Sequence, residues 1–130
     1  MFAMILSSAA ANAADVEVHI HGVASTKGFI MVALCDEAEF LKTCAREART
    51  PATRGDAGVA FPDVPAGRWA VMAYHDENGN GRLDKNVLGV PTEGTAFSRD
   101  AKGHFGPPSF NDAAFSAGAG KTVLDVKLSY

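Results

Sequence analysis

The sequence predicts an all-β protein in which residues 14–130 form one mostly antiparallel β-sandwich with a single short helix near residues 37–48. Three observations lead to this prediction. Short segments alternate apolar and polar residues, which is typical of strands with one buried face. Turn residues separate these segments, and no strand–helix–strand alternation indicates a parallel sheet covered by helices. The 130 residues contain neither an internal repeat nor a linker, so a single domain is expected.

Residues 1–13 are expected to be a signal peptide that precedes the fold. The segment MFAMILSSAAANA carries no charged residue, and its apolar run passes into small residues that end in Ala11-Asn12-Ala13. This pattern is typical of a secretory signal, and an Ala-rich tail without that role is the alternative. No apolar run reaches the roughly 18 residues that a membrane span needs. We therefore expect a periplasmic or secreted protein.

Two strands are predicted before the first cysteine. In residues 15–22, DVEVHIHG, the residues Val16, Val18 and Ile20 lie on one face, and acidic residues and histidines lie on the other. Residues 28–35, GFIMVALC, are apolar on both faces, which is typical of a central strand covered on each side. The second strand is therefore expected in the middle of a sheet.

The short helix is predicted within residues 36–49. Phe40, Cys44 and Ala48 are spaced four apart, and Asp36 and Glu39 have the spacing of a capping box. A proline two residues after this segment would end the helix.

Cys35 and Cys44 are the candidates for a disulfide in an exported protein. A continuous helix between them would hold their Cα atoms about 13 Å apart, beyond the roughly 7 Å that a disulfide spans. The bridge therefore requires a turn that folds the chain back beside Cys35, and two buried free thiols are the alternative. No C-x-x-C redox motif is present, so the pair is assigned a structural role.

The remaining strands follow from shorter patterns. Residues 59–61 and 68–75 are predicted strands separated by a turn at residues 62–67. Residues 88–98 hold strand-like fragments, and residues 99–120 are rich in loop-forming residues. The final segment, TVLDVKLSY, alternates regularly and predicts a terminal strand. Its apolar face consists of Thr122, Leu124, Val126 and Leu128.

The segment from Asp76 to Asp84 carries the strongest chemical signal. It has the pattern D-x-N-x-N-G-x-x-D, in which oxygen-bearing side chains occupy the first, third, fifth and ninth places. Calcium requires about six to eight oxygen ligands, which a short loop supplies by turning alternate residues inward around a glycine. The predicted ligands are the side chains of Asp76, Asn78, Asn80 and Asp84 and the backbone carbonyl of Arg82.

The loop departs from a helix–loop–helix calcium site at its twelfth position, where Val87 stands in place of a bidentate glutamate. With two carboxylates in the loop, the missing charge would come from Glu93 or Glu77. The expected calcium affinity is weak, roughly 10⁻⁴–10⁻³ M. The alternative needs no metal, because Asn-Gly pairs also favour tight turns in which aspartates accept backbone N–H groups.

His19 and His21 lie two apart on one predicted strand, so both imidazoles project from the same face and form a secondary candidate site for zinc or copper. Two solvated histidines are the alternative. No nucleophile motif such as G-x-S-x-G is present, so no catalytic residue is assigned. The formal net charge of −3, from 12 Lys and Arg against 15 Asp and Glu, argues against nucleic acid as a partner.

Two segments carry a family resemblance. The run VAFPDVPAGRWAVMAYHDENGNGRLDKNVLGVPTEGTAFS and the later GPPSFNDAAF resemble the secreted bacterial family called domain of unknown function 2141, over essentially the whole mature chain. The H-D-x-N-x-N-G-x-x-D core of that family falls on residues 75–84, and its G-x-P-x-E-G turn falls on residues 89–94. Trp69, where the family more often has tyrosine, and Thr95-Ala96, where an aromatic-Gly pair is common, depart from the pattern.

The resemblance implies a fold and a ligand but no activity, since that family is uncharacterised. The segment F-x-D-V-P-x-G-x-W is also similar to transthyretin-like (prealbumin-like) and carboxypeptidase-regulatory-like sandwiches, which implies an immunoglobulin-like arrangement of two sheets. Because Glu93 falls in a family motif beside the loop, the resemblance makes it the preferred distal calcium ligand.

We therefore expect an exported β-sandwich module with a binding or accessory role, not an enzyme. Its expected partner is an envelope component or a small ligand. The runner-up is a metal-dependent hydrolase whose cleft gathers His75, Asp76 and Glu93, with His104 as a further member. A closed, buried site would favour a structural ion, whereas an open metal position in a concave pocket would favour catalysis.

Overall fold

The computed structural model describes residues 13–88, 91–103, 106–118 and 120–130. Residues 1–12 of the predicted signal peptide lie outside these ranges, as does His104, whereas Ala13 begins the first strand. Within the described ranges, no helix is long and apolar enough to cross a membrane.

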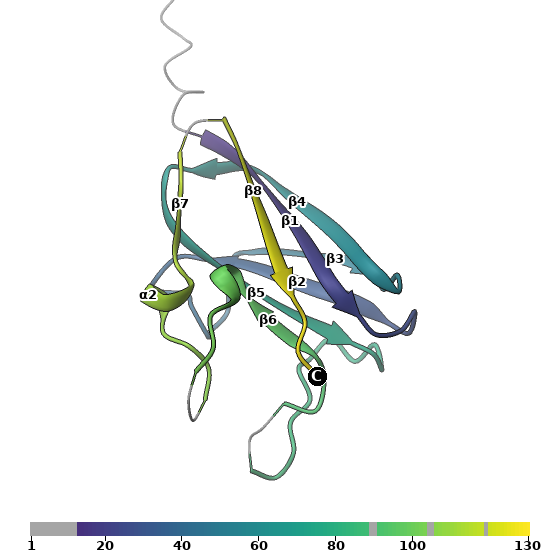
Figure 1. The fold of residues 1–130 in the computed structure, drawn as a ribbon. Helices are drawn as coiled ribbons and strands as arrows, with labels where there is room; N and C mark the ends of the chain where they lie inside the picture. The colour runs from purple at the N-terminus through teal and green to yellow at the C-terminus, as the bar shows by residue number, and fades with distance from the viewer. Residues whose placement is uncertain (1–12, 89–90, 104–105, 119) are drawn as a thin grey trace, which may run out of the picture.

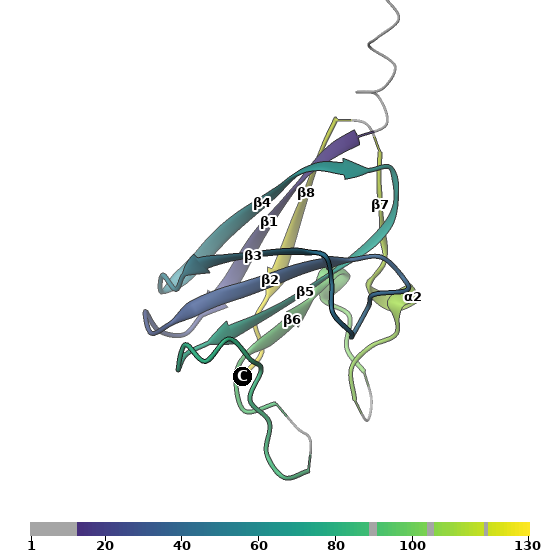
Figure 2. The same ribbon diagram turned by 180° about the vertical axis from the view of Figure 1, so that it is seen from behind.

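The described residues form an all-β fold of two sheets, as predicted (Figures 1 and 2). One sheet has the strand order β4-β1-β8; the other has the order β3-β2-β5-β6, with β7 paired to β5. All strand pairs are antiparallel except β1 with β8. The strands are β1 (Ala13–Val23), β2 (Phe29–Cys35), β3 (Arg46–Pro51), β4 (Gly55–Pro65), β5 (Gly67–Asp76), β6 (Thr95–Phe97), β7 (Phe115–Ala117) and β8 (Gly120–Lys127).

The main core lies between the two sheets, and the period-two pattern of the sequence selects it. The first sheet contributes Val16, Val18 and Ile20 from β1, each fully buried, and the second contributes Ile30 and Leu34 from β2. Strand β2 lies between β3 and β5, so the prediction of a central strand is confirmed. Burying these side chains stabilises the fold by roughly 1.5–3 kcal/mol for each large aliphatic residue.

The chain between β4 and β5 turns more tightly than predicted. Strand β4 continues to Pro65, so Ala66 is the one residue outside the two strands. The register of β4 against β1 shifts by one residue near Asp63, which has a positive φ of 54°. This shift is a β-bulge, a common feature of edge strands such as β4.

The helix predicted near residues 37–48 is wrong. Residues 37–41 form turns, and strand β3 begins at Arg46. The capping-box pair does form, because the Glu39 N–H donates to the Asp36 carboxylate at 2.9 Å and the Asp36 N–H donates to the Glu39 carboxylate at 3.3 Å. The chain then leaves the helical path at Leu41, whose φ of 65° is left-handed. The helical segments lie elsewhere, as η2 (Ser98–Asp100) and α2 (Phe110–Ala113).

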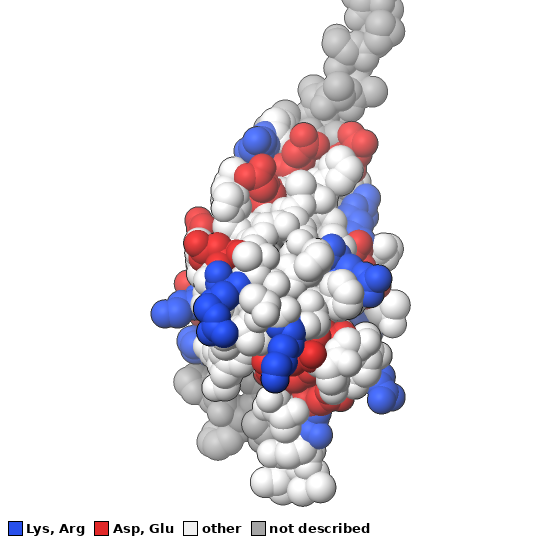
Figure 3. Space-filling view, turned by 90° about the vertical axis from the view of Figure 1, so that its right-hand side faces the viewer, with Lys and Arg blue, Asp and Glu red and all other residues white. Residues whose placement is uncertain are grey.

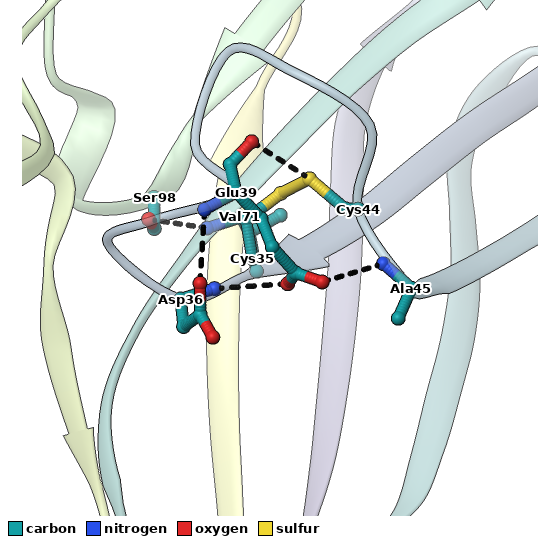
Figure 4. Close-up of a disulfide and its surroundings, with 7 residues drawn as sticks. All are labelled: Cys35, Asp36, Glu39, Cys44, Ala45, Val71 and Ser98. Atoms are coloured by element: carbon teal, nitrogen blue, oxygen red, sulfur yellow. Dashed lines mark hydrogen bonds between the residues drawn. A yellow bond between two sulfur atoms is a disulfide. The ribbon is translucent and has the colours of Figure 1, made fainter.

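The predicted disulfide between Cys35 and Cys44 is confirmed (Figure 4). The fold-back that the bridge required is present, and the two Cα atoms lie 5.3 Å apart. Glu39 supports this fold-back, since its second carboxylate oxygen accepts the N–H of Ala45 at 3.0 Å. One carboxylate therefore ties both ends of the segment that the disulfide closes.

A second, smaller core lies on the other face of the β3-β2-β5-β6 sheet, because Cys35 and Ala70 point away from the neighbouring Leu34 and Val71. The Phe40 ring contacts the rings of Phe97 and Phe110 edge-on. The disulfide segment and α2 thus cover one end of this sheet face.

Candidate functional site

The segment that follows β5 is held by the buried carboxylate of Asp76. Only 1% of this residue is exposed. Its two carboxylate oxygens accept the N–H groups of Asn80, at 3.2 Å, and Gly81, at 2.8 Å. Gly79 and Gly81 have φ values of 70° and 77°, a left-handed conformation that side chains disfavour. The glycines therefore let the chain curl around the Asp76 carboxylate.

Glu93 joins the two arms of the loop from the far side. This residue is 8% exposed, and its carboxylate oxygens accept the N–H of Glu77 at 3.1 Å and the N–H of Asp84 at 3.1 Å. The backbone of Asp84 is also paired with Thr92, whose N–H donates to the Asp84 carbonyl at 2.8 Å. The structure thus brings Glu93 to the Asp76–Asp84 segment. We refer to residues 76–84 together with Glu93 as the acidic loop.

The remaining predicted ligands form a network of their own at the outer side of the acidic loop. The amide nitrogens of Asn78 and Asn80 donate to the two carboxylate oxygens of Asp84, at 2.6 and 2.8 Å. These bonds, that from Asn80 first, lower the pKa of Asp84. Asn80 Oδ1 accepts the N–H of Arg82 at 2.9 Å. Asp84 is therefore ionised at neutral pH, and its carboxylate oxygens are occupied by hydrogen bonds from the two asparagines.

The acidic loop concentrates negative charge at one end of β5. Among the described residues, Asp76, Asp84 and Glu93 form no ion pair with a lysine or arginine. Nor do the described residues include three or more His, Cys, Asp or Glu side chains gathered closely enough to hold a metal. The pKa of Tyr74, the residue two before Asp76, is raised by burial and then by the charge of Asp76 and other nearby carboxylates. In this arrangement, N–H groups of the loop itself occupy its carboxylate oxygens.

His75 contacts the acidic loop from inside the fold and does not face a cleft. The residue is fully buried. Its Nε2 lies 2.8 Å from the Lys27 carbonyl oxygen, and its Nδ1 lies 2.8 Å from the Tyr130 hydroxyl. Sequence reasoning did not assign Tyr130 to this site, because an aromatic residue after a terminal strand indicates nothing about its partner. Both ring nitrogens of His75 thus have hydrogen-bond partners within the protein.

His19 and His21 point outward from β1, as their alternation predicts, but they have separate partners. His19 Nε2 lies 2.8 Å from Glu17. His21 lies between Asp56 of β4 and Asp125 of β8, at 2.8 Å from each. A shallow hollow beside His19 is lined by Glu17, His19, Gly58, Val59 and Ala60. His19 therefore pairs with a residue of its own strand, and His21 pairs across strands with β4 and β8.

The stability contributed by His21 is expected to fall as the pH rises. The bond to Asp125, and then that to Asp56, raise the pKa of His21 above its ordinary value. A raised pKa in the folded state gives stability that is complete below the unfolded pKa and is lost as the pH rises through the folded pKa. The gain is at most about 1 kcal/mol, because solvent screens exposed pairs.

Urea unfolding of wild type and of His21→Gln measures this contribution. The difference between the two proteins should be larger at about pH 5.5 than at about pH 9. An equal difference at both pH values would show that the ion pairs do not stabilise the fold.

The surface carries charges of both signs. On the face shown in Figure 3, Lys and Arg side chains are interspersed with Asp and Glu. This face presents no continuous positive field of the kind that binds nucleic acid.

Comparison with known proteins places the chain in a family. A family model described as "Uncharacterized protein conserved in bacteria (DUF2141)" matches residues 18–125, a range that includes the acidic loop. No curated protein and no solved structure matches the chain. The match covers most of the 130 residues and runs from β1 to β8. The chain therefore belongs to the bacterial family of domain of unknown function 2141.

Proposed function

We propose that this protein is an exported β-sandwich module that binds an envelope component or a small ligand, and that a calcium ion stabilises its acidic loop. One observation carries the calcium part: three carboxylates belong to one loop, two of them are buried, and among the described residues none forms an ion pair with a basic side chain. Hydrogen bonds to N–H groups satisfy the oxygens of these carboxylates but leave their net charge. A divalent cation would offset most of it.

The loop offers the number and kind of ligands that calcium prefers. Its side-chain donors are the carboxylates of Asp76, Asp84 and Glu93 and the amide oxygens of Asn78 and Asn80; the Arg82 carbonyl would add a sixth oxygen. An incoming ion would compete with the hydrogen bonds that these oxygens now accept. This competition supports a weak affinity, of roughly 10⁻⁴–10⁻³ M, such as extracellular calcium modules show.

The ion would have a structural role, because the residues around it are buried and a substrate could not reach them. A catalytic metal keeps an open coordination position that faces a cleft. Here His75, Asp76 and Glu93 are 0%, 1% and 8% exposed, and both His75 nitrogens have partners. These contacts favour a binding or accessory role over the hydrolase.

Export is supported by two features. The disulfide is compatible with an extracytoplasmic location, where thiols oxidise, and residues 1–13 have the pattern of a secretory signal. An oxidising compartment outside the cytoplasm also offers calcium at concentrations that a weak site needs.

Calorimetric titration and thermal unfolding test the calcium site. At 10 mM calcium, taken as about 10–100 times Kd, the expected stabilisation is about 1.4–2.7 kcal/mol, with a matching rise in Tm. Asp84→Asn should lose most of this response, because it removes one of the loop's carboxylates while keeping the side chain's shape. Glu37→Gln, an exposed acid in the disulfide segment, is the matched control and should keep it. Absence of both heat and a Tm shift in wild type would refute the calcium site.

A further inference from the structure

The last residue of the chain contacts the base of the acidic loop. The Tyr130 hydroxyl accepts the N–H of Ala24 at 2.8 Å and lies 2.8 Å from His75 Nδ1. The two rings also meet edge-on, with centroids 5.9 Å apart. Tyr130 thereby joins the end of the chain to the β1–β2 connection and to the last buried residue before Asp76.

The direction of these hydrogen bonds follows from what each atom can donate. The Lys27 carbonyl can only accept, so His75 Nε2 carries a hydrogen and donates to it. In the neutral imidazole, Nδ1 is then an acceptor and receives the Tyr130 hydroxyl hydrogen. The hydroxyl oxygen in turn accepts from Ala24. The Tyr130 hydroxyl therefore both donates and accepts, and phenylalanine at position 130 would leave the buried His75 Nδ1 without a donor.

The same residues fix both ends of the acidic loop. The backbone N–H of His75 donates to the Gly94 carbonyl at 2.9 Å, which places Asp76 beside Glu93. The Tyr130 ring packs on Gly94 so closely that a Cβ there would lie 2.6 Å from the ring. Thr95 and Ser129 exchange two backbone hydrogen bonds of 2.9 Å each. Gly94 is thus required by contact with the end of the chain.

We propose that Tyr130 is a positioning residue that couples the C-terminal segment to the order of the acidic loop. With the hydroxyl in place, His75 and Gly94 are held, and Asp76 and Glu93 face the loop from opposite sides. The coupling is a property of the protein without metal. Its extension to calcium affinity rests on the proposed function, because an ion that requires the ordered loop binds more weakly when the population of that order falls.

Residue-specific amide hydrogen exchange tests this coupling in the metal-free protein. In Tyr130→Phe, the amides that Asp76 and Glu93 hold, those of Glu77, Asn80, Gly81 and Asp84, should exchange about five- to tenfold faster, the effect of losing about one hydrogen bond. Amides of the β1–β4 ladder should be unchanged. Lys102→Ala is the matched control, because it removes the contact of Lys102 with Ser129 at 3.3 Å and leaves the Tyr130 hydroxyl bonds intact.

The outcomes separate this proposal from the calcium site. Faster loop exchange in Tyr130→Phe but not in Lys102→Ala supports the coupling, whether or not wild type binds calcium. If wild type binds calcium, the same variant should weaken its affinity only in proportion to the lost population of the ordered loop. Unchanged loop exchange, or equal acceleration of loop and ladder amides, would overturn the coupling even if calcium binds. Acceleration by Lys102→Ala as well would also overturn it, since general loosening of the terminus would then suffice.

Discussion

Replacing Cys35 and Cys44 together by alanine is expected to lower the free energy of unfolding by about 2–4 kcal/mol. The bridge closes a loop of about ten residues, and the entropy of that loop in the unfolded chain corresponds to roughly 2–3 kcal/mol. Both sulfurs are also buried, at 0% and 5% residue exposure, so their removal takes contacts from the smaller core. This loss is a large share of the roughly 5–15 kcal/mol that stabilises a domain.

Urea unfolding with and without a thiol reductant measures this effect. Reductant should lower the midpoint of wild type towards that of the double variant and should not change the double variant itself. Phe40 lies in the disulfide segment and contacts Phe110, so the side-chain signals of these two residues should report the loosening of the smaller core. A wild-type midpoint that reductant does not move would show that the bridge adds nothing to stability.

Residues 36–51 show where local sequence patterns fail. Phe40, Cys44 and Ala48 are four apart, and four is also an even number, so the same spacing fits one face of a strand. The capping-box pair of Asp36 and Glu39 forms without a helix, because the disulfide and Glu39 close the chain into a turn instead. The sequence patterns for a helix and for a disulfide are incompatible in these residues, and the chain adopts the fold-back that the disulfide requires.

Strands β1 and β8 could be predicted because each alternates regularly and buries apolar residues, as Val16, Val18 and Val126 are buried. Strand β2 could be predicted because its residues are apolar on both faces. Strand β3 was missed because its charged residues Arg46, Glu47 and Arg49 conceal the alternation, which is common in edge strands. The parallel pairing of β1 with β8 is a contact between distant segments, and no local pattern encodes it.

The acidic loop was located from residue types and spacing, whereas its supporting contacts were not. Glycine and asparagine positions indicate a turn that presents oxygens, because their conformational preferences are local. The contact of Tyr130 with His75, and that of Asp56 and Asp125 with His21, depend on which strands become neighbours. Such partners follow only from the strand order.

Replacing Asp76 by alanine is expected to be among the most costly changes in this protein, at about 2–4 kcal/mol. The change removes the acceptor of the Gly81 N–H and one of the two acceptors of the Asn80 N–H, which also donates to Asn78 Oδ1 at 3.2 Å. Each hydrogen bond to a charged group contributes roughly 1.5–3 kcal/mol. The expected cost is less than that of two such hydrogen bonds at the upper value, because Asn80 and Gly81 are both exposed and water replaces part of the lost hydrogen bonding. Urea unfolding in the presence of a chelator measures this cost without any contribution from metal.

Asp84→Ala separates the internal role of Asp76 from a general effect of removing loop charge. Asp84 interacts through its side chain with the amides of Asn78 and Asn80 at the outer side of the loop, so this variant should destabilise the metal-free protein less than Asp76→Ala does. Both variants should lose the calcium-dependent rise in Tm. Equal costs for the two would contradict the view that Asp76 organises the loop, and an unchanged calcium response in Asp76→Ala would place the ion elsewhere. The shape of the acidic loop thus depends on buried carboxylates such as Asp76, and its charge depends on the sum of its carboxylates; the two variants measure these contributions separately.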